Sequence, residues 1–345
     1  LVLAGCGGNK PAETPAEKDV VVGFIYVGPI GDGGYTYAHN EGRLYLEEQL
    51  GVKTLYKENV AEEDQEVMNA VADMIDQGAT VVFATSFGHM DGLEKASKEY
   101  PEVAFMHCSG FKMTENMGNY FGRMYQARYL SGIVAGLKTE TNNIGYVGAF
   151  EIPEVVRGLN AFTLGVKSVN PEAVVNFKTT QTWYDPATEK EAAKALLDAG
   201  ADVIAQHQDT AGPQQAAEEA GAFSIGYNTD MKAAAPGAYM TAPIWNWGPY
   251  YVTQVQAVID GTWKAESYWG GMVDEIVALA PLTELAPAEA ADLIEAAKAK
   301  IISGETDVFV GPINDNQGNL KVAEGQKLTD EEMLSMDWYV EGVKK

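Results

Sequence analysis

Short apolar runs alternate with helical patterns along most of the chain, and this alternation limits the possible folds more than any other feature. Val20–Val27 is almost continuously apolar, as expected for a strand that is buried on both faces of a sheet. A glycine-rich turn and a helix that ends near Leu50 follow, and the order of strand, turn and helix repeats as far as Phe223–Tyr227. This alternation predicts an α/β fold with parallel sheets covered by helices.

The second half of the chain repeats a junction found in the first half. Asp76–Phe83 and Asp198–Ala205 both combine a helix end, a glycine cap and a buried strand. Because 345 residues also exceed the usual size of one domain, we expect two α/β units. The loops Ser86–Gly88 and Gln208–Thr210 would then face each other across a ligand cleft. A chance likeness of the two junctions and one large open sheet are the alternatives.

The charge balance of the chain excludes some partners. A formal net charge of −25 repels nucleic-acid phosphates, so we expect no nucleic-acid partner. No internal apolar run reaches the roughly 18 residues that suggest a membrane span. Of the two cysteines, Cys108 lies in a predicted strand and is interpreted as a packed thiol.

The other cysteine, Cys6, follows Leu-Ala-Gly, which resembles the lipobox of bacterial lipoproteins. In such proteins the signal peptide is removed just before a cysteine that is then acylated. The residues after Cys6 are polar and without periodicity. We therefore expect residues 1–18 to be a signal remnant and linker, and Cys6 to anchor an extracytoplasmic protein to the bacterial cell membrane. The alternative is an ordinary buried cysteine.

The sequence contains no motif that assembles a catalytic site. His39, His89, His107 and His207 lack metal-ligand spacing, and no nucleophile elbow, P-loop or zinc-protease motif occurs. Gly31–Gly34 follows the first strand but lacks the spacing of a dinucleotide fingerprint. We therefore expect no enzyme activity, no cofactor and no metal. A nucleoside hydrolase, the enzyme alternative, would need clustered carboxylates, which the sequence does not show.

Aromatic residues occur in predicted loops at the ends of strands, where ligands bind in α/β folds. These aromatic residues are Tyr35, Tyr37, Trp183 and Trp245. Two aromatic faces stabilise a flat ring placed between them. Asp209 and Asp230, which also follow predicted strands, would accept hydrogen bonds from ring or exocyclic N–H groups. The pattern therefore predicts a planar, nitrogen-containing ligand, although each aromatic residue taken alone fits a packed core and each acid a helix cap or solvated loop.

Short motifs spread over about Val20–Pro281 extend this picture. They are Gly31–Tyr37, Tyr120–Arg123, Tyr129–Gly132, Trp183–Ala187, Gly200–Ile204, Gly226–Asp230 and Ala278–Pro281. Together they resemble the basic-membrane-protein (BMP) family of bacterial ABC-transporter substrate-binding lipoproteins, in its purine- and nucleoside-binding group. The resemblance implies a type I periplasmic-binding-protein fold, in which two Rossmann-like lobes joined by hinge crossovers close on a ligand. The N-terminal lobe is expected at residues 19–140 plus 243–272, and the C-terminal lobe at residues 141–242 plus 273–345.

The resemblance also implies roles for single residues. The two stacking aromatics of the family fall on Tyr35 and Trp183, and its hydrogen-bonding acid near the hinge falls on Asp230. The remaining candidates for the cleft wall follow strand ends, namely Phe87, Arg123, Tyr125, Glu151, Gln208 and Asp209. For Arg123 a structural salt bridge, and for Glu151 a helix cap, are the alternatives.

The chain departs from the nucleoside-binding pattern at Trp245, which stands where those members usually place a lysine that resembles a ribose holder. An indole supplies no cation there and would fill the space of a sugar. Tyr37 and His39 likewise replace more polar residues. We therefore expect a free purine base, adenine-like, to bind in preference to a nucleoside.

These features predict a monomeric extracytoplasmic receptor of an ABC importer, which holds a purine base between two lobes and presents it to a membrane permease. A nucleoside, or another small polar ligand such as a sugar, is the alternative ligand. A ligand sensor that does not transport is the alternative role, because both roles need a clamp that closes on a ligand.

Overall fold

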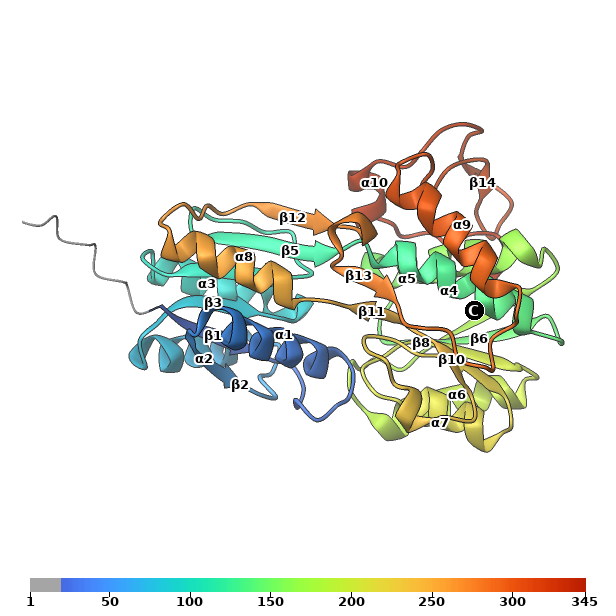
Figure 1. Ribbon diagram of the computed structural model, residues 1–345, viewed down its shortest axis with the longest axis horizontal. Helices are drawn as coiled ribbons and strands as arrows, with labels where there is room; N and C mark the ends of the chain where they lie inside the picture. The colour runs from blue at the N-terminus through green and yellow to red at the C-terminus, as the bar shows by residue number, and fades with distance from the viewer. Residues whose placement is uncertain (1–19) are drawn as a thin grey trace, which may run out of the picture.

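Residues 20–345 are described by the computed structural model, in which two six-stranded sheets are flanked by helices (Figure 1). The expected α/β fold with two parallel sheets is confirmed, and the alternative of one large open sheet is wrong. The expected lipidation site, Cys6, lies outside the described residues. Within the described part of the chain, no helix combines the length and hydrophobicity that a bilayer span requires.

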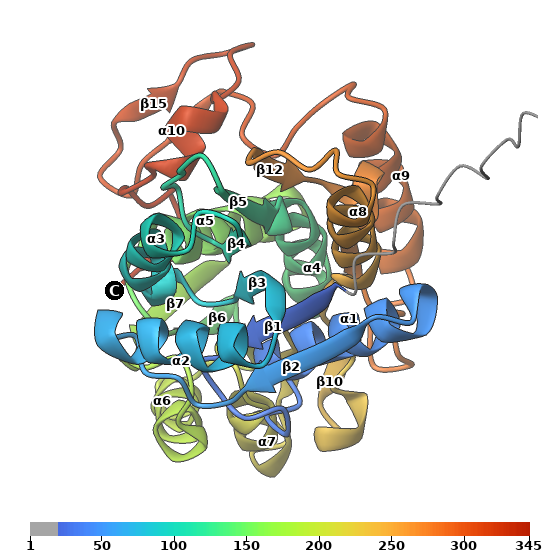
Figure 2. The ribbon, with the colours of Figure 1, turned by 90° about the vertical axis from the view of Figure 1, so that its left-hand side faces the viewer.

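The first sheet has the strand order β12–β5–β4–β3–β1–β2, and all neighbouring strands are parallel. Its strands are β1 (Val21–Ile25), β2 (Lys53–Lys57), β3 (Ala79–Ala84), β4 (Ala104–Cys108), β5 (Met117–Gly122) and β12 (Ser267–Gly270). Helices α2 (Asp64–Asp76) and α3 (Met90–Glu99) pack on one face, and α1 (Tyr35–Leu50) and α8 (Gly248–Ile259) on the other (Figure 2). Because both faces are covered, the central strands are mostly apolar, and β1 (VVGFI) has no polar side chain.

The second sheet has the strand order β10–β9–β8–β6–β7–β16 and is also parallel. Its strands are β6 (Asn143–Gly148), β7 (Val174–Thr179), β8 (Val203–His207), β9 (Phe223–Ile225), β10 (Tyr239–Thr241) and β16 (Val343–Lys344). Helices α4 (Met124–Lys138) and α5 (Pro153–Val169) pack together, and α6 (Pro186–Asp198) and α7 (Gly212–Glu219) cover the opposite face. A Cβ atom on Gly132 would stand 2.1 Å from the carbonyl oxygen of Phe162, so α4 and α5 approach this closely only because glycine lies at their crossing.

The two repeated junctions have the same local structure. Gly78 and Gly200 follow the ends of α2 and α6 with φ angles of 97° and 93°, a conformation that residues with a side chain rarely adopt. Each junction leads into a strand inside its sheet, β3 between β1 and β4, and β8 between β6 and β9. The likeness of the two sequence segments therefore reflects equivalent positions in the two sheets.

Within residues 20–345 the chain crosses between the sheets three times. It passes from β5 to α4 through Arg123, from β10 through β11 (Pro243–Trp245) to α8, and from β12 through β13 (Val277–Leu279) to α9 (Ala290–Ile302). Strands β11 and β13 pair antiparallel, and α9 packs against α4. Hinge bending in proteins of this architecture is absorbed by such short connections.

The C-terminal segment, residues 305–345, follows α9. It contains the antiparallel pair β14 (Ile313–Asn314) and β15 (Leu320–Val322), the short helix α10 (Asp330–Leu334) and β16. Strand β16 extends the second sheet beside β7, and α10 packs against α5. Figures 1 and 2 show α10 close to α5 and to the end of β12.

Candidate ligand-binding cleft

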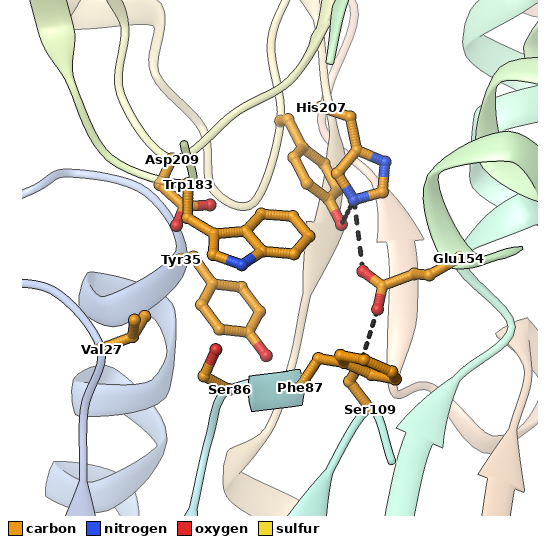
Figure 3. A pocket seen from close by; sticks show the side chains of 10 residues that line it. Val27, Tyr35, Ser86, Phe87, Ser109, Glu154, Trp183, His207 and Asp209 are labelled. Carbon is orange, nitrogen blue, oxygen red and sulfur yellow. Dashed lines mark hydrogen bonds and ion pairs between the residues drawn. The ribbon is translucent and has the colours of Figure 1, made fainter. Parts of the chain in front are cut away.

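A cavity of about 320 Å³ lies between the two sheets, at the carboxyl ends of their strands (Figure 3). It is lined by Val27, Tyr35, Ser86, Phe87 and Ser109 from the first sheet and its loops, and by Glu154, Trp183, His207, Asp209 and Tyr227 from the second. The structure thus brings together four predicted site residues: Tyr35, Phe87, Trp183 and Asp209. The loops after β3 and β8 meet here, as the repeated junctions predict.

Tyr35 is the first residue of α1, and Asp32 fixes the start of this helix. The Asp32 carboxylate accepts hydrogen bonds from three backbone N–H groups at distances of 2.8–2.9 Å, as helix-capping acids do. Burial raises the pKa of Asp32 to about 6, although these hydrogen bonds oppose the rise. The Tyr35 hydroxyl donates to the carbonyl oxygen of Thr85 at 2.5 Å. Both ends of the Tyr35 side chain are therefore held, and its ring is fixed against the cavity.

Trp183 lies in the loop between β7 and α6. Its indole meets the ring of Phe150 edge-on, with the ring centroids 5.1 Å apart, and its carbonyl oxygen accepts a hydrogen bond from the Asp209 N–H at 3.3 Å. Figure 3 shows that the Trp183 indole and the Tyr35 phenol both point into the cavity. The two aromatic side chains expected from the sequence therefore border one space, and they come from different sheets.

A polar network crosses the cleft at Glu154, in the first turn of α5. The Glu154 carboxylate accepts hydrogen bonds from the Ser109 hydroxyl of the first sheet and from Nε2 of His207 at 3.2 Å (Figure 3). Burial, together with the charge of Arg128, lowers the pKa of His207 to about 4, so its ring is neutral near pH 7 and donates from Nε2. Burial opposes ionisation of Glu154, but the hydrogen bonds from His207 and Ser109 hold its pKa below the usual value. Glu154 is therefore an ionised acceptor.

Asp209 follows β8 and provides the second carboxyl group of the cavity. Burial raises its pKa well above the usual value, and the nearby charges of Asp32, Glu189 and Glu154 add to the effect. A group of this kind gains most from a partner that offers it an N–H or O–H donor, because such a donor stabilises the charged form. Asp209 is therefore well suited to accept a hydrogen bond from a ligand.

The cleft is closed in this structure. The Thr229 hydroxyl donates to the carbonyl oxygen of Gly33 at 2.5 Å, which joins the second sheet to the turn before α1. A Cβ atom on Gly34 would stand 2.1 Å from the carbonyl oxygen of Asp209. The loops of the two sheets therefore touch across the cleft.

Tyr37, Gln208 and Asp230 lie outside the lining of the cavity. Tyr37 is exposed on α1. Gln208 is buried, and its side-chain amide donates to the hydroxyl of Thr180 at 2.5 Å. Asp230 accepts a hydrogen bond from the backbone N–H of Lys232 at 3.1 Å. The roles in binding that the sequence suggests for these three residues stay predictions.

His39 and Trp245 belong to a chain of aromatic rings behind the cavity. The ring of His39 stacks on Trp247 with centroids 4.6 Å apart, and Trp247 stacks on Trp245 at 4.4 Å. The chain begins at Tyr35, 4.5 Å from His39, and continues from Trp245 to Tyr227 at 6.4 Å. Both end residues line the cavity, whereas Trp245 itself lies in the crossover strand β11.

Arg123, Tyr125 and Glu151 contact the C-terminal segment and do not line the cavity. Arg123 pairs with Asp330, and the Tyr125 hydroxyl donates to Asp307 at 3.3 Å. The Glu151 carboxylate accepts from a tyrosine and a lysine of the same segment. These contacts agree with the salt-bridge alternative for Arg123.

Several lining residues have no assigned role from the sequence, namely Val27, Ser86, Ser109, Glu154, His207 and Tyr227. Glu154 is the most consequential of them. Helix α5 begins at Pro153, so the acid of its first turn faces the cavity, whereas Glu151 lies in the preceding loop. A proline commonly stands at the first position of a helix, and it was the available signal for this choice.

Among residues 20–345, no group of three or more His, Cys, Asp or Glu side chains is arranged to hold a metal ion. Cys108 is buried, and its thiol lies 3.4 Å from the hydroxyl of Tyr35. The chemistry of the cavity therefore consists of aromatic faces, hydroxyl groups, one imidazole and two carboxyl groups.

This chain is similar in sequence to known families and proteins. Residues 19–310 match the family model described as ABC transporter substrate-binding protein PnrA-like (Bmp). A purine-binding protein of Brucella abortus is 41% identical over 330 residues, which cover 95% of this chain and 94% of that protein. A putative ABC transporter glucose-binding protein of Haloferax volcanii is 40% identical over 300 residues, covering 86% of this chain and 76% of that protein.

The solved structure of an ABC transporter solute-binding protein from Aeropyrum pernix has a TM-score of 0.74 at 19% identity, and covers 92% of this chain and 98% of that one. Likenesses of this kind show the type I periplasmic-binding-protein fold that the sequence predicts. The chain belongs to the PnrA-like (Bmp) family of extracytoplasmic ABC transporter substrate-binding proteins.

Proposed function

We propose that this protein captures a free purine base, adenine-like, in the cavity between its two sheets and presents it to the permease of an ABC importer. The observation that carries the proposal is the meeting of two aromatic side chains from different sheets, Tyr35 and Trp183, with two carboxyl groups, the half-buried Glu154 and the buried Asp209, around one cavity.

The chemistry of the cavity supports a flat ring that carries N–H groups. Aromatic faces give dispersion and burial to a planar heterocycle. The ionised Glu154 and the buried Asp209 accept hydrogen bonds, which suits the exocyclic amino group and ring N–H of a purine. The His207 Nε2–H is already engaged by Glu154.

The closeness of the two sheets supports a small planar ligand, such as a base without its sugar. The Thr229 hydroxyl already bonds to the carbonyl oxygen of Gly33 across the cleft, so little space remains between the lining side chains. The purine-binding relative of Brucella abortus supports the same class of ligand.

A sugar is the second candidate ligand, because the relative of Haloferax volcanii is described as a putative glucose-binding protein. Sugars also stack on aromatic side chains, and carboxylates accept hydrogen bonds from sugar hydroxyls. A nucleoside is larger than a base by its ribose, so it requires a wider cleft than a free base does.

The test is a calorimetric titration with adenine, hypoxanthine, adenosine, inosine and glucose on protein unfolded and refolded to remove retained ligand. The proposal expects adenine or hypoxanthine to bind more tightly than its nucleoside, and glucose not to compete. Tighter binding of the nucleosides, or binding of glucose alone, would overturn it. Mass spectrometry of the small molecules released by denaturation identifies the natural ligand independently.

We also propose that the protein is a monomer held at the cell membrane through an acylated Cys6. The resemblance of Leu3–Cys6 to a lipobox supports this anchor, and more than one acyl chain would be needed for stable attachment. Labelling with a radioactive fatty acid should mark the wild-type protein and not Cys6→Ser, and equal labelling of the two would refute the anchor.

A further inference from the structure

The C-terminal segment, residues 305–345, packs firmly although the family match ends at residue 310. The side chains of Met333, Met336 and Val340 are buried, and β16 adds a strand to the second sheet. The segment takes no part in lining the ligand cavity. Its contacts with the rest of the molecule therefore need another explanation.

One set of contacts fastens the segment to α5, on the second sheet. The guanidinium of Arg157 donates to the carbonyl oxygen of Met333 at 2.8 Å. The side chain of Asn160 donates to the carbonyl oxygen of Trp338 at 2.7 Å and accepts from the N–H of Val340 at 3.0 Å. Helix α10 therefore moves with the second sheet.

A second set of contacts reaches the first sheet through Arg123, in the crossover from β5 to α4. The Arg123 N–H donates to the carbonyl oxygen of Gly270 at 2.6 Å, and its Nε donates to that of Trp269 at 3.1 Å, both in the edge strand β12. Its guanidinium also lies over the Trp269 ring, 4.2 Å from the centroid. The position of Arg123 is therefore set by the first sheet and the crossover.

The two sets meet in one ion pair. The guanidinium of Arg123 donates twice to the carboxylate of Asp330, with distances of 2.8 and 2.6 Å. This fork-to-fork geometry fixes both distance and angle between the partners. The pair thus connects β12, at the edge of the first sheet, with α10, which is bound to the second.

A second cavity is lined by α10 together with residues of the first sheet and of α5, which belongs to the second. This space of about 990 Å³ is lined by Leu334 of α10, by Tyr268 and Trp269 of β12, and by Phe87 and Glu154 of the ligand cavity among others. It adjoins the ligand cavity, because both contain Phe87, Ser109 and Glu154. Its width depends on how far the two sheets are bent apart.

We infer that the C-terminal segment is a brace across the hinge, and that the Arg123–Asp330 pair sets how readily the closed cleft opens to release its ligand. Arg123 is then a positioning residue that acts on the hinge, at a distance from the ligand. Opening of the cleft pulls β12 away from α10 and breaks the pair. The brace therefore adds to the lifetime of the closed form, whichever ligand is bound.

The inference rests on the proposed function only for the choice of adenine as probe. The variants are Asp330→Asn, which removes the charge, Asp330→Glu, which keeps it, and the control Asp337→Asn, which removes an exposed charge from the same segment. The readouts are the radius of gyration of ligand-free protein by small-angle X-ray scattering and the dissociation rate of adenine by stopped-flow fluorescence. Thermal unfolding of each variant checks that it is folded.

Asp330→Asn should dissociate adenine about two- to fivefold faster, the size expected for one partly exposed ion pair, and should enlarge the ligand-free radius. Asp330→Glu and Asp337→Asn should match the wild type, and high salt should remove the difference. Equal radius and rate for Asp330→Asn and wild type, or the same change in Asp337→Asn, would overturn the inference. If adenine does not bind, the ligand-free radius still decides it, and the proposed ligand alone is wrong. If Asp330→Asn does not fold, the salt dependence of Asp330→Glu decides the inference. Faster dissociation of adenine at high salt than at low salt supports it, and equal rates overturn it.

Discussion

Replacement of Asp209 by asparagine should weaken adenine binding by about 10- to 150-fold. The side chain is buried and lines the cavity, and the substitution removes the charge while it keeps the shape. A hydrogen bond to a charged group contributes about 1.5–3 kcal/mol, and each 1.4 kcal/mol changes a dissociation constant about tenfold. The expected loss follows from these two values.

The assay is isothermal titration at pH 7.5, with Asp230→Asn as the matched control. Asp230 is the acid that the family resemblance assigns to the ligand, but its carboxylate lies outside the lining and bonds to the N–H of Lys232. From the position of Asp230 outside the cavity lining we expect this control to bind adenine as the wild type does, against the role that the family resemblance suggests. A strong loss in Asp230→Asn together with unchanged binding in Asp209→Asn would refute the reasoning.

Asp209→Asn should also abolish the release of a proton that accompanies adenine binding to the wild type. Burial, with the charges of Asp32, Glu189 and Glu154, raises the pKa of Asp209, so this carboxyl group keeps its proton to a higher pH than an exposed aspartate does. A ligand N–H stabilises the ionised form and lowers this pKa, so binding releases a proton and affinity rises with pH. Titrations in buffers of different ionisation enthalpy measure the release. Identical proton release in wild type and Asp209→Asn would contradict this assignment.

Three further substitutions test an aromatic side chain of the cavity, the closure of the cleft and a buried histidine. Trp183→Ala should weaken adenine binding by about 30-fold or more, as truncation of a central aromatic contact does, whereas Tyr184→Ala, at an exposed neighbour, should not change the titration. Gly34→Ala would place a Cβ atom 2.1 Å from a backbone oxygen across the cleft. Adenine should therefore dissociate faster from this variant than from the control Gly31→Ala, where a Cβ atom would have no neighbour within 4 Å. Equal dissociation rates of the two variants would contradict a tight closure at this turn. Burial lowers the pKa of His107 to about 4, so the unfolded chain binds a proton that the folded protein does not, and the free energy of unfolding falls by about 2 kcal/mol from pH 7 to pH 5. In urea unfolding, His107→Gln should show a decrease over this pH range that is smaller by that amount. An unchanged pH dependence in this variant would exclude His107 as the source.

The fold was predictable because its signals are local. The sequence predicts that the first helix ends near Leu50, and α1 spans Tyr35–Leu50. Burial on both faces of a parallel sheet leaves an apolar run that needs no knowledge of distant partners. The lobe boundary expected at residue 140 has no such local signal. Helix α4 lies before this residue in the sequence, yet it packs against α5, which lies after it. That packing depends on Gly132 and Phe162, which the chain pattern does not connect.

The placement of residues at the cavity was predictable where the ends of strands determine it, and it was unpredictable where tertiary contacts determine it. Trp183 and Asp209 follow strands of one sheet, so the topology alone brings them to the cleft. Arg123 also follows a strand, but its carboxylate partner Asp330 is 207 residues away in sequence. The sequence has no local feature that couples such a pair. The choice between neighbouring acids, Glu151 and Glu154, likewise depended on the residue at which α5 begins.

The stacked indoles of Trp245 and Trp247 have a consequence for measurement. They lie 4.4 Å apart and within 18° of parallel, one in a crossover strand and the other at the start of α8. Electronic coupling between two such chromophores depends steeply on their mutual orientation. Near-ultraviolet circular dichroism of the unlabelled protein should therefore record the bending of the molecule directly, with its own tryptophans as the reporter.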